Sequence, residues 1–421
     1  MLRASAISGM PAGARNHGET AMPALSVRSF YERFPYPQKA ADHLSGDILP
    51  SSFDAVRHHC WAGHWPAGRS FRALVAGGGT GDAIVSLGLS MRRRGIAGSI
   101  HYVDLSKTSA EIARSRAEHA RLDNVTFEVG PIEAVRGEYD YIDLSGVLPI
   151  IGDPAALLRH LASLLVDDGA MGVMSYGRVG RTGVEPFRRI YRTVMGDNVD
   201  TAAARELIAA LPPHNWLRAN PKLGVDLDRI GDVELADRLL APHEFAYSVT
   251  ELAEMFDRAG LPIRAFIPSL VYEPAHLLKS GDLRDRLAGL SYIERAQVAE
   301  DAQGDLNKHV FYAAKIGAAP IDIQGLLDRD DVVLLPRNLD CRGMSSALGG
   351  GADAVSVGIR IDAVERSVTI RGGAEAARFV AALEGEPTVG ALRSSISDDT
   401  IRYMSRLLVA VEALHFAVPS R

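Results

Sequence analysis

The stretch Phe71–Asp82, which reads FRALVAGGGTGD, predicts the class of fold because it joins a short apolar run to a glycine-rich turn. The apolar run fits a buried strand, and a helical pattern follows over residues 83–94. Glycines at such a turn let a ligand approach the backbone closely and present helix N–H groups to something polar or negative. An ordinary tight turn explains the glycines alone equally well.

The spacing of the glycines separates the cofactors that such a turn can hold. A dinucleotide site needs glycines at positions i, i+2 and i+5, but Asp82 and Ile84 stand where this pattern requires glycine. A phosphate-binding P-loop does not fit either, because no Gly-Lys-Ser/Thr follows. The remaining pattern, Gly77-x-Gly79-x-Gly81, opposes a nicotinamide-dependent oxidoreductase.

Asp104, at the end of the next predicted strand, adds a second signal. A carboxylate at this position can accept hydrogen bonds from both hydroxyls of a ribose. Taken alone, Asp104 could also be a solvated acid at a strand end. Together with the three glycines, it favours a ligand that carries adenosine without a pyrophosphate.

Short apolar runs alternate with helical stretches along this region, which is typical of a parallel sheet covered by helices. Further strands are predicted at residues 99–103, 125–129, 139–144, 170–175, 262–266 and 309–316, with helices at 108–121 and 154–165. We therefore predict an α/β, Rossmann-like sheet with a helical cap and a small C-terminal accessory domain.

The composition of the chain changes at several places, which suggests domain boundaries. We predict a flexible lead at 1–25, a helical lid at 26–70, the sheet domain at 71–317 with a cap insertion at about 178–245, and an accessory domain at 321–421, of small α/β or winged-helix type. A polar helical stretch at about 275–305 could extend the cap. Ser248 or Thr250 is predicted to cap the helix that follows the insertion.

These residues together resemble class I S-adenosylmethionine-dependent methyltransferases. The resemblance rests on LVAGGGTGD at 74–82, VDLS at 103–106, FEVGPIE at 127–133, YDYIDLSGVL at 139–148 and LLVDDG at 164–169. It is closer to bacterial members that carry FYERFPYP, here at 30–37, and YGRVGRTGV, here at 176–184. It implies that residues 71–317 are a class I methyltransferase domain and that S-adenosyl-L-methionine is the cofactor.

The resemblance also implies which residues surround this cofactor. Its expected contacts are Gly77, Gly79, Gly81 and the adjoining Asp82 beside the amino-acid part, Asp104 on the ribose, Leu105 on the adenine, Gly130 and Ile132 at the adenine edge, Ser145 and Gly146 facing the methyl group, and Tyr31 and Tyr36 as a lid.

The chain departs from the family pattern at the position where a base is expected. Pro149 and Ile150 stand where a pair of histidines commonly follows the Gly-Val-Leu phrase, which removes an acid/base group. Tyr176 is the first candidate to replace it, with His214 and Tyr247 as alternatives. Packing or loop hydrogen bonding is the better interpretation for each of the three taken alone.

Two smaller departures concern the cofactor. Val75 and Pro131 stand where many members of the family have an acid. Both changes are expected to tune cofactor affinity.

The overall composition limits the partners. The 421 residues carry a formal net charge of -6, which makes nucleic acid an unlikely partner. Because no apolar run approaches the roughly 20 residues that span a bilayer, no membrane partner is expected. The two cysteines, Cys60 and Cys341, exclude a disulfide scaffold and favour a cytoplasmic setting. The oligomeric state stays open.

The segment His58-His59-Cys60, with His64 nearby, has residue types that bind metals. Adjacent histidines rarely both point at one ion, so a helix packed on the domain through Trp61 and Trp65 is the better interpretation. We expect no metal site from this segment.

The expected function is methyl transfer by in-line displacement to a small molecule or a peptide side chain. The sequence contains no Asn-Pro-Pro-Tyr phrase and no catalytic cysteine pair, so it gives no signal for methylation of amides, base nitrogens or cytosine carbon. The missing histidine pair keeps an alternative open, namely a non-catalytic S-adenosylmethionine-binding sensor or assembly subunit.

Overall fold

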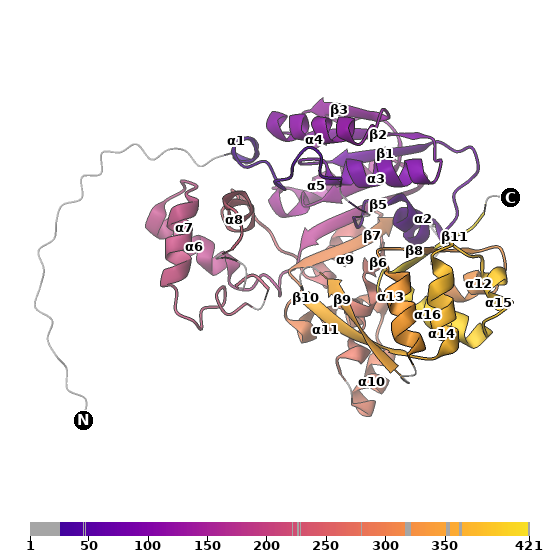
Figure 1. Cartoon of the computed structure of the whole chain (residues 1–421). Coiled ribbons are helices and arrows are strands. Elements are labelled where there is room, and N and C mark those ends of the chain that lie inside the picture. The colour runs from indigo at the N-terminus through magenta and orange to yellow at the C-terminus, as the bar shows by residue number, and fades with distance from the viewer. Residues whose placement is uncertain are drawn as a thin grey trace, which may run out of the picture.

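The computed structural model describes residues 26–44, 46, 48–220, 222–224, 227, 229–278, 280–315, 321–350, 354–361 and 364–419. A seven-stranded sheet in the order β3-β2-β1-β4-β5-β7-β6 runs through its centre (Figure 1). The strands are β1 (Phe71–Ala76), β2 (Gly98–Asp104), β3 (Val125–Val129), β4 (Tyr139–Ser145), β5 (Leu165–Tyr176), β6 (Ile263–Ile267) and β7 (Lys308–Ala314). This topology confirms the predicted α/β, Rossmann-like fold.

The direction of β7 differs from a purely parallel sheet. Strands β1 to β5 pair in parallel, but β7 pairs antiparallel with both β5 and β6. The prediction of a parallel sheet is therefore right for the first five strands and wrong for β7. The side-chain pattern of a strand reports which positions are buried and carries no information on direction.

Helices cover both faces of the sheet. Because successive side chains of a strand point to opposite faces, Ala73 and Val75 of β1 pack in one core while Leu74 and Ala76 pack in the other. The first core includes α2 (Phe53–Trp61), α3 (Asp82–Arg93) and α4 (Lys107–His119). The second includes α5 (Pro154–Leu164), α9 (Val249–Arg258) and α11 (Tyr292–Gln303).

The start of α9 agrees with the sequence, and the position of α11 does not. Ser248 caps α9 and forms a capping box with Glu251, which confirms the predicted cap. The stretch 275–305 contains α10 (Gly281–Ala288) and α11. Ala296 of α11 lies in the core beneath α9, so α11 belongs to one face of the sheet and does not extend the cap.

Three helices follow β5 in the segment for which a cap was expected. They are α6 (Val184–Met195), α7 (Thr201–Ala210) and α8 (Asp232–Leu239), and they share a core of their own (Figure 1). The N-terminal helix α1 (Val27–Arg33) joins this core through Phe30, and Phe34 follows it there. The N-terminal segment is therefore attached to the three helices as well as to the sheet.

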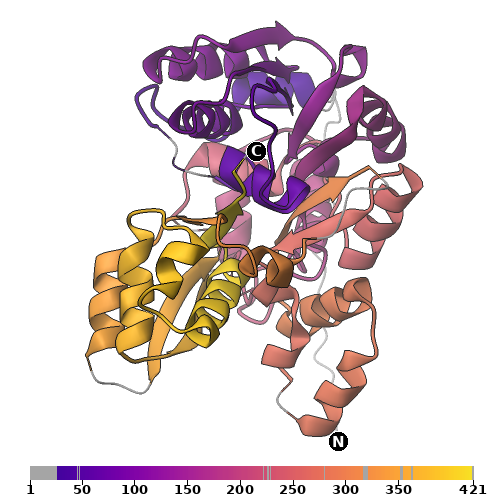
Figure 2. The same ribbon diagram turned by 90° about the vertical axis from the view of Figure 1, so that its right-hand side faces the viewer.

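The C-terminal residues form a further layer beside α2 (Figure 2). Its elements are α12 (Ile323–Leu327), β8 (Val333–Pro336), α13 (Cys341–Gly349), β9 (Ala354–Ile361), β10 (Val364–Arg371), α14 (Ala374–Leu383), α15 (Val389–Arg393), α16 (Asp398–Ala410) and β11 (Leu414–Ala417). β9 pairs with β10 and β8 with β11, both antiparallel. These elements enclose a separate hydrophobic core.

Within the described ranges, none of the helices combines the length and the apolar composition needed to cross a membrane.

Candidate functional site

The glycine turn between β1 and α3 is tightly enclosed. Gly77, Gly79 and Gly81 have φ angles of 71°, 50° and 97°, which favour glycine. A Cβ at Gly77 would lie 2.4 Å from Cγ2 of Val147, and one at Gly79 would lie 2.6 Å from the carbonyl oxygen of Tyr36. The turn therefore admits only backbone at these two positions.

The backbone N–H groups of residues 77–81 are already used. Gly77 and Gly78 donate to Val103 O, Gly81 donates to Gly78 O, and Thr80 donates to the carbonyl oxygen of Tyr36 at 3.2 Å. Together with Gly79, which donates to Asp104, these five residues offer no free backbone N–H to a ligand, so the predicted N–H groups at the start of the helix would have to come from α3 itself. A turn of this kind offers a phosphate little, which agrees with the absence of a dinucleotide pattern.

Asp104, at the end of β2, faces the turn. Its Oδ2 accepts the N–H of Gly79 at 2.9 Å, and its Oδ1 accepts the N–H of Ser106 at 2.8 Å. Burial raises the pKa of Asp104, and these N–H donors oppose the shift. A carboxylate offers about four acceptor sites, so these bonds leave Asp104 capacity for a further donor such as a ribose hydroxyl.

A cavity of about 580 Å³ opens beside this turn. Eleven residues that the sequence singled out line it: Tyr31, Tyr36, Gly77, Gly79, Asp82, Asp104, Leu105, Ile132, Ser145, Gly146 and Tyr176. Two do not. Gly81 is packed against Ala113 of α4, and Gly130 donates its N–H to the carbonyl oxygen of Asp104, so both support the walls from behind.

Asp82 is held by two cations from opposite sides. Nζ of Lys39 and a guanidinium nitrogen of Arg116 each lie 2.8 Å from one of its carboxylate oxygens. Arg116 also donates to the carbonyl oxygens of Thr80 and His43. Asp82 thereby ties the N-terminal segment to the start of α3.

The N-terminal segment forms one wall of the cavity. Glu32 accepts the N–H groups of Lys107 and Thr108 at the start of α4, at 2.6 and 3.1 Å. Pro37 O accepts the hydroxyl of Thr80 at 2.6 Å. These bonds hold the N-terminal segment in place, so that Tyr31 and Tyr36 line the cavity beside the glycine turn.

Asp237 of α8 lines the cavity with Glu234 and Glu244, a group that we call its acidic end, and it was not predicted from the sequence. Its two oxygens accept the hydroxyls of Tyr31, at 3.0 Å, and Tyr176, at 3.3 Å. Burial raises the pKa of Asp237 to about 6. Its one signal in the sequence is an acid within a short amphipathic helix that carries three acids and an arginine, a pattern that also fits an exposed helix face.

Tyr176 is a hydrogen-bond donor at this end of the cavity. Burial raises the pKa of its phenol well above 10, and the negative charge of Asp237 adds to the shift. The hydroxyl therefore stays protonated at neutral pH, which is the opposite of what a proton acceptor needs. The guanidinium of Arg181 lies 3.9 Å from the centre of the Tyr176 ring and holds it in place.

The other candidate bases lie elsewhere. His214 is exposed, and the side chain of Tyr247 packs in the core near α9. Where the histidine pair was expected, Pro149 is buried and Ile150 lines the cavity. Two carboxylates that line the cavity, Asp237 and Asp143 of β4, have pKa values that burial raises to about 6.

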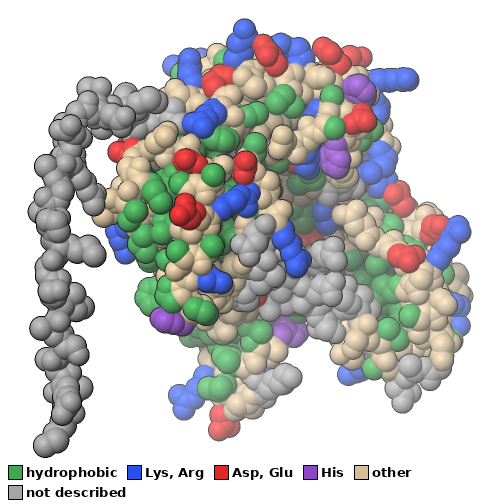
Figure 3. All heavy atoms as spheres, turned by 60° about the vertical axis from the view of Figure 1, so that its left-hand side comes forward, with side chains coloured by type: hydrophobic (Ala, Val, Ile, Leu, Met, Phe, Trp, Pro, Cys, Tyr) green, Lys and Arg blue, Asp and Glu red, His purple; other side chains and the backbone are tan. Residues whose placement is uncertain are grey.

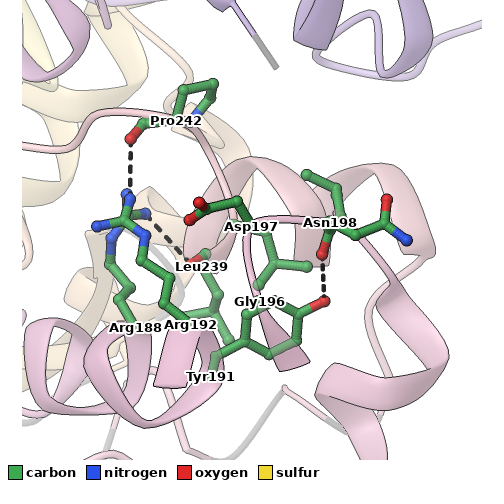
Figure 4. A pocket seen from close by; sticks show the side chains of 10 residues that line it. Arg188, Tyr191, Arg192, Gly196, Asp197, Asn198, Leu239 and Pro242 are labelled. Carbon is green, nitrogen blue, oxygen red and sulfur yellow. Dashed lines mark hydrogen bonds between the residues drawn. The ribbon is translucent and has the colours of Figure 1, made fainter. Parts of the chain in front are cut away.

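Arginines fasten the end of α8 to α6 (Figure 4). Arg188 donates to Leu239 O at 3.2 Å, and Arg192 donates to Pro242 O at 2.9 Å. The hollow between them has a volume of only about 50 Å³, which is too small for a metabolite. Its guanidinium groups bind backbone carbonyls and so fix the helix that carries Asp237.

A second cavity of about 580 Å³ adjoins the first on the outer side of the cap, and Glu244 lines both. Trp216 and Phe245 line this outer cavity with exposed fractions of 66% and 44%. Figure 3 turns the side of the molecule that carries α6–α8 forward and shows hydrophobic side chains mixed with charged ones of both signs. The inner cavity therefore borders an aromatic surface.

Comparisons with known proteins agree on the fold. Residues 74–171 match the family model described as "Methyltransferase domain". An uncharacterized protein of Synechococcus sp. is 25% identical over 332 residues, which cover 73% of this chain and 75% of that protein.

Among solved structures, PKMT2 from Rickettsia typhi is similar with a TM-score of 0.60 and 14% identity, covering 90% of this chain and 76% of that one. Its complex with AdoHcy gives a TM-score of 0.62 and 15% identity, covering 91% and 77%. At this identity the likeness concerns the fold, and it extends well beyond the residues that the family model matches.

Proposed function

We propose that the S-adenosylmethionine-dependent methyltransferase domain of this chain transfers the methyl group of the cofactor to an amine nitrogen. The transfer is an in-line displacement, and the amine belongs to a small molecule or a peptide side chain. The observation that carries the proposal is the acidic end of the cavity. Asp237 lies there between two tyrosine hydroxyls, in the same cavity as the glycine turn and Asp104.

The residues near the turn suit the cofactor. The positions of Gly77 and Gly79 leave no room for a Cβ, and the open lone pairs of Asp104 suit ribose hydroxyls. The cofactor supplies an electrophilic methyl group when bound. Ser145 and Gly146, at the end of β4, would face the methyl group according to the resemblance, and both line the cavity.

The charge of the cavity supports a cationic acceptor. Among its described lining residues, seven are acidic and two, Lys39 and Lys308, are basic, and three of the acids, Asp82, Glu234 and Glu244, form ion pairs with lysine or arginine. The carboxylate of Asp237 in this lining attracts an ammonium group. A neutral or anionic acceptor would gain nothing from it.

Asp237 can both hold an ammonium group and take its proton. An amine attacks a methyl group only after it loses a proton, so a base with a pKa nearer to neutrality than that of an ordinary carboxylate is useful. Burial raises the pKa of Asp237 to about 6, and the hydroxyls of Tyr31 and Tyr176 fix the orientation of its carboxylate.

The apolar wall near β4 contributes positioning. Val147, Ile150 and Met174 line the cavity, and they exclude water from the reacting atoms. Holding the attacking atom in line can lower the barrier by about 7–11 kcal/mol without any base. The absence of the histidine pair from this wall is the observation that favours the alternative, a non-catalytic S-adenosylmethionine sensor.

Sinefungin tests the proposal without a known acceptor, because an amine-bearing carbon replaces the methylated sulfur in this analogue. We expect the wild-type protein to bind sinefungin more tightly than S-adenosylhomocysteine in calorimetry. Asp237→Asn should reduce this preference about tenfold, the scale of one hydrogen bond to a charged group, and leave the affinity for S-adenosylhomocysteine unchanged.

Asp232→Asn is the matched control, since Asp232 lies on the exposed side of the same helix and pairs with Arg205. An equal preference in the wild type and in Asp237→Asn would exclude Asp237 from the acceptor position. Binding of neither compound would contradict the cofactor site itself. Formation of S-adenosylhomocysteine with an amine panel separates an enzyme from a sensor.

A further inference from the structure

Three side chains from distant parts of the sequence meet where α2 packs against β11. His59 comes from α2, Glu412 from the turn before β11, and His415 from β11 itself. All three are buried, with exposed fractions of 6%, 3% and 1%. This group lies outside the cavity described above.

The two imidazoles approach one carboxylate oxygen. Nε2 of His59 lies 3.1 Å from Oε2 of Glu412, and Nε2 of His415 lies 3.0 Å from the same atom. The three atoms lie within 4.8 Å of one another. Such spacing brings two nitrogen lone pairs and a carboxylate to a common point.

Hydrogen bonding alone uses this carboxylate poorly. Both nitrogens contact Oε2, while Oε1 of Glu412 is buried without a hydrogen-bond partner. A buried carboxylate oxygen without a partner costs free energy, and buried charges are normally paired or bound to metals. A cation that accepts both oxygens would satisfy the atom that the histidines leave unpaired.

The rings are oriented by stacking. The ring of His59 lies on that of Tyr312, with centroids 4.8 Å apart and planes at 19°. The ring of His415 lies on that of His58, with centroids 5.2 Å apart and planes at 28°. His58 is itself fixed, because its Nδ1 accepts the N–H of Phe416 at 3.2 Å. Ligands held in this way lose little freedom when an ion binds.

We propose that His59, Glu412 and His415 form a binding site for a divalent transition metal, for which zinc fits best. Two imidazole nitrogens and a carboxylate are a common zinc ligand set, and both oxygens of Glu412 complete four-fold coordination. Because the site is buried and lies away from the cavity, the ion is structural and joins α2 to the C-terminal layer.

The proposed site differs from the candidate metal ligands that were identified in the sequence. Of His58, His59, Cys60 and His64, only His59 takes part. The thiol of Cys60 is buried in the core of the sheet domain, and His64 is exposed. The other two ligands lie more than 350 positions further along the chain, so no local spacing could reveal them.

Metal analysis of the full-length protein tests the site. After expression in medium supplemented with zinc and removal of free metal, we expect about one zinc per chain by mass spectrometry. His59→Gln, Glu412→Gln and His415→Gln should each lose most of this zinc. His64→Gln, a substitution of an exposed histidine just after the same helix, should retain it.

A second measurement, on the wild-type protein, tests the site even if the variants fail to fold. A chelator added to the wild-type protein should lower the melting temperature, and Zn²⁺ should restore it while Mg²⁺ does not. Co²⁺ in place of zinc should give the visible absorption of a four- or five-coordinate ion. Unchanged zinc content in all three ligand variants, or a wild-type protein that takes up neither Zn²⁺ nor Co²⁺, would overturn the proposal.

Discussion

Asp104 combines a structural and a ligand-binding task in one carboxylate. Because it accepts the N–H of Gly79 and keeps lone pairs for a ribose, Asp104→Ala should weaken binding of S-adenosylhomocysteine by about 1.5–3 kcal/mol. Calorimetry measures the change, and Asp123→Ala at an exposed loop position is the control. An unchanged affinity in a folded Asp104→Ala protein would remove this residue from the site.

Asp237 should make the stability of the protein depend on pH. Its pKa is raised to about 6 in the folded state from an ordinary value of 3.8, so the folded protein binds this proton more tightly than the unfolded chain does. The resulting stabilisation is fully present below pH about 4 and is lost as the pH rises through about 6, with a total of about 3 kcal/mol.

Asp237→Asn should therefore flatten the pH dependence of the free energy of unfolding between these pH values, as measured by urea denaturation. Part of the slope should remain, because Asp143 is also buried with a pKa of about 6. Asp232→Asn should follow the wild-type curve. Identical curves for Asp237→Asn and the wild type would mean that Asp237 is not desolvated in solution.

At the level of elements, the turn between β1 and α3 was predictable because its signal is local. Three alternating glycines and the acid at the end of β2 lie close in sequence, and both border the cavity or its walls. Gly81 was predicted to contact the cofactor, yet it packs against α4. A glycine with a positive φ can serve close packing as well as ligand binding, so the sequence pattern does not separate the two.

The acidic end of the cavity could not be predicted in the same way. Tyr31 and Asp237 are 206 positions apart, and Tyr176 is 61 positions from Asp237. Their meeting depends on how α1 and α8 share one core, which no short motif encodes. The phenol of Tyr176 was therefore the first candidate base, although packing was the better interpretation, and burial beside Asp237 raises its pKa well above 10.

The contact between the glycine turn and the N-terminal segment gives a prediction for an element. Gly79→Ala should strain the backbone by about 1–2 kcal/mol and also push the carbonyl of Tyr36 away, since the new Cβ would lie 2.6 Å from its oxygen. We expect weaker binding of S-adenosylhomocysteine and faster proteolysis of the N-terminal segment.

Gly95→Ala is the matched control for this substitution. Gly95 has a similar φ of 64°, but nothing lies within 4 Å of its Cβ position. The strain is thus shared by the two variants, and any difference in ligand binding reports the contact with Tyr36. Equal affinities would show that this contact does not shape the site.

At the level of the whole molecule, the C-terminal layer is connected to the sheet domain through α2. Arg94 pairs with both Asp54 of α2 and Glu386, and Val418 donates its N–H to the carbonyl oxygen of Gly63. Removing residues 321–421 should leave binding of S-adenosylhomocysteine intact, because the described residues that line the cavity all precede the cut.

The same truncation should lower the free energy of unfolding, since α2 loses these partners and exposes buried imidazoles. Calorimetry and urea denaturation of the truncated chain measure the two effects. A truncated protein that unfolds cooperatively but binds no ligand would show that the layer acts on the cavity from a distance. One that cannot fold would make the layer part of the same folding unit.

The N-terminal segment beside the glycine turn is expected to limit the rate at which the cofactor exchanges. Tyr31, Tyr36 and Lys39 bound the cavity on one side and are held there by bonds to Thr80, Asp82 and the start of α4. We expect a bound S-adenosylhomocysteine to leave when these bonds open. We therefore expect slow release of S-adenosylhomocysteine, at a rate set by local opening of the N-terminal segment. Hydrogen–deuterium exchange at residues 31–39 should slow when S-adenosylhomocysteine is bound.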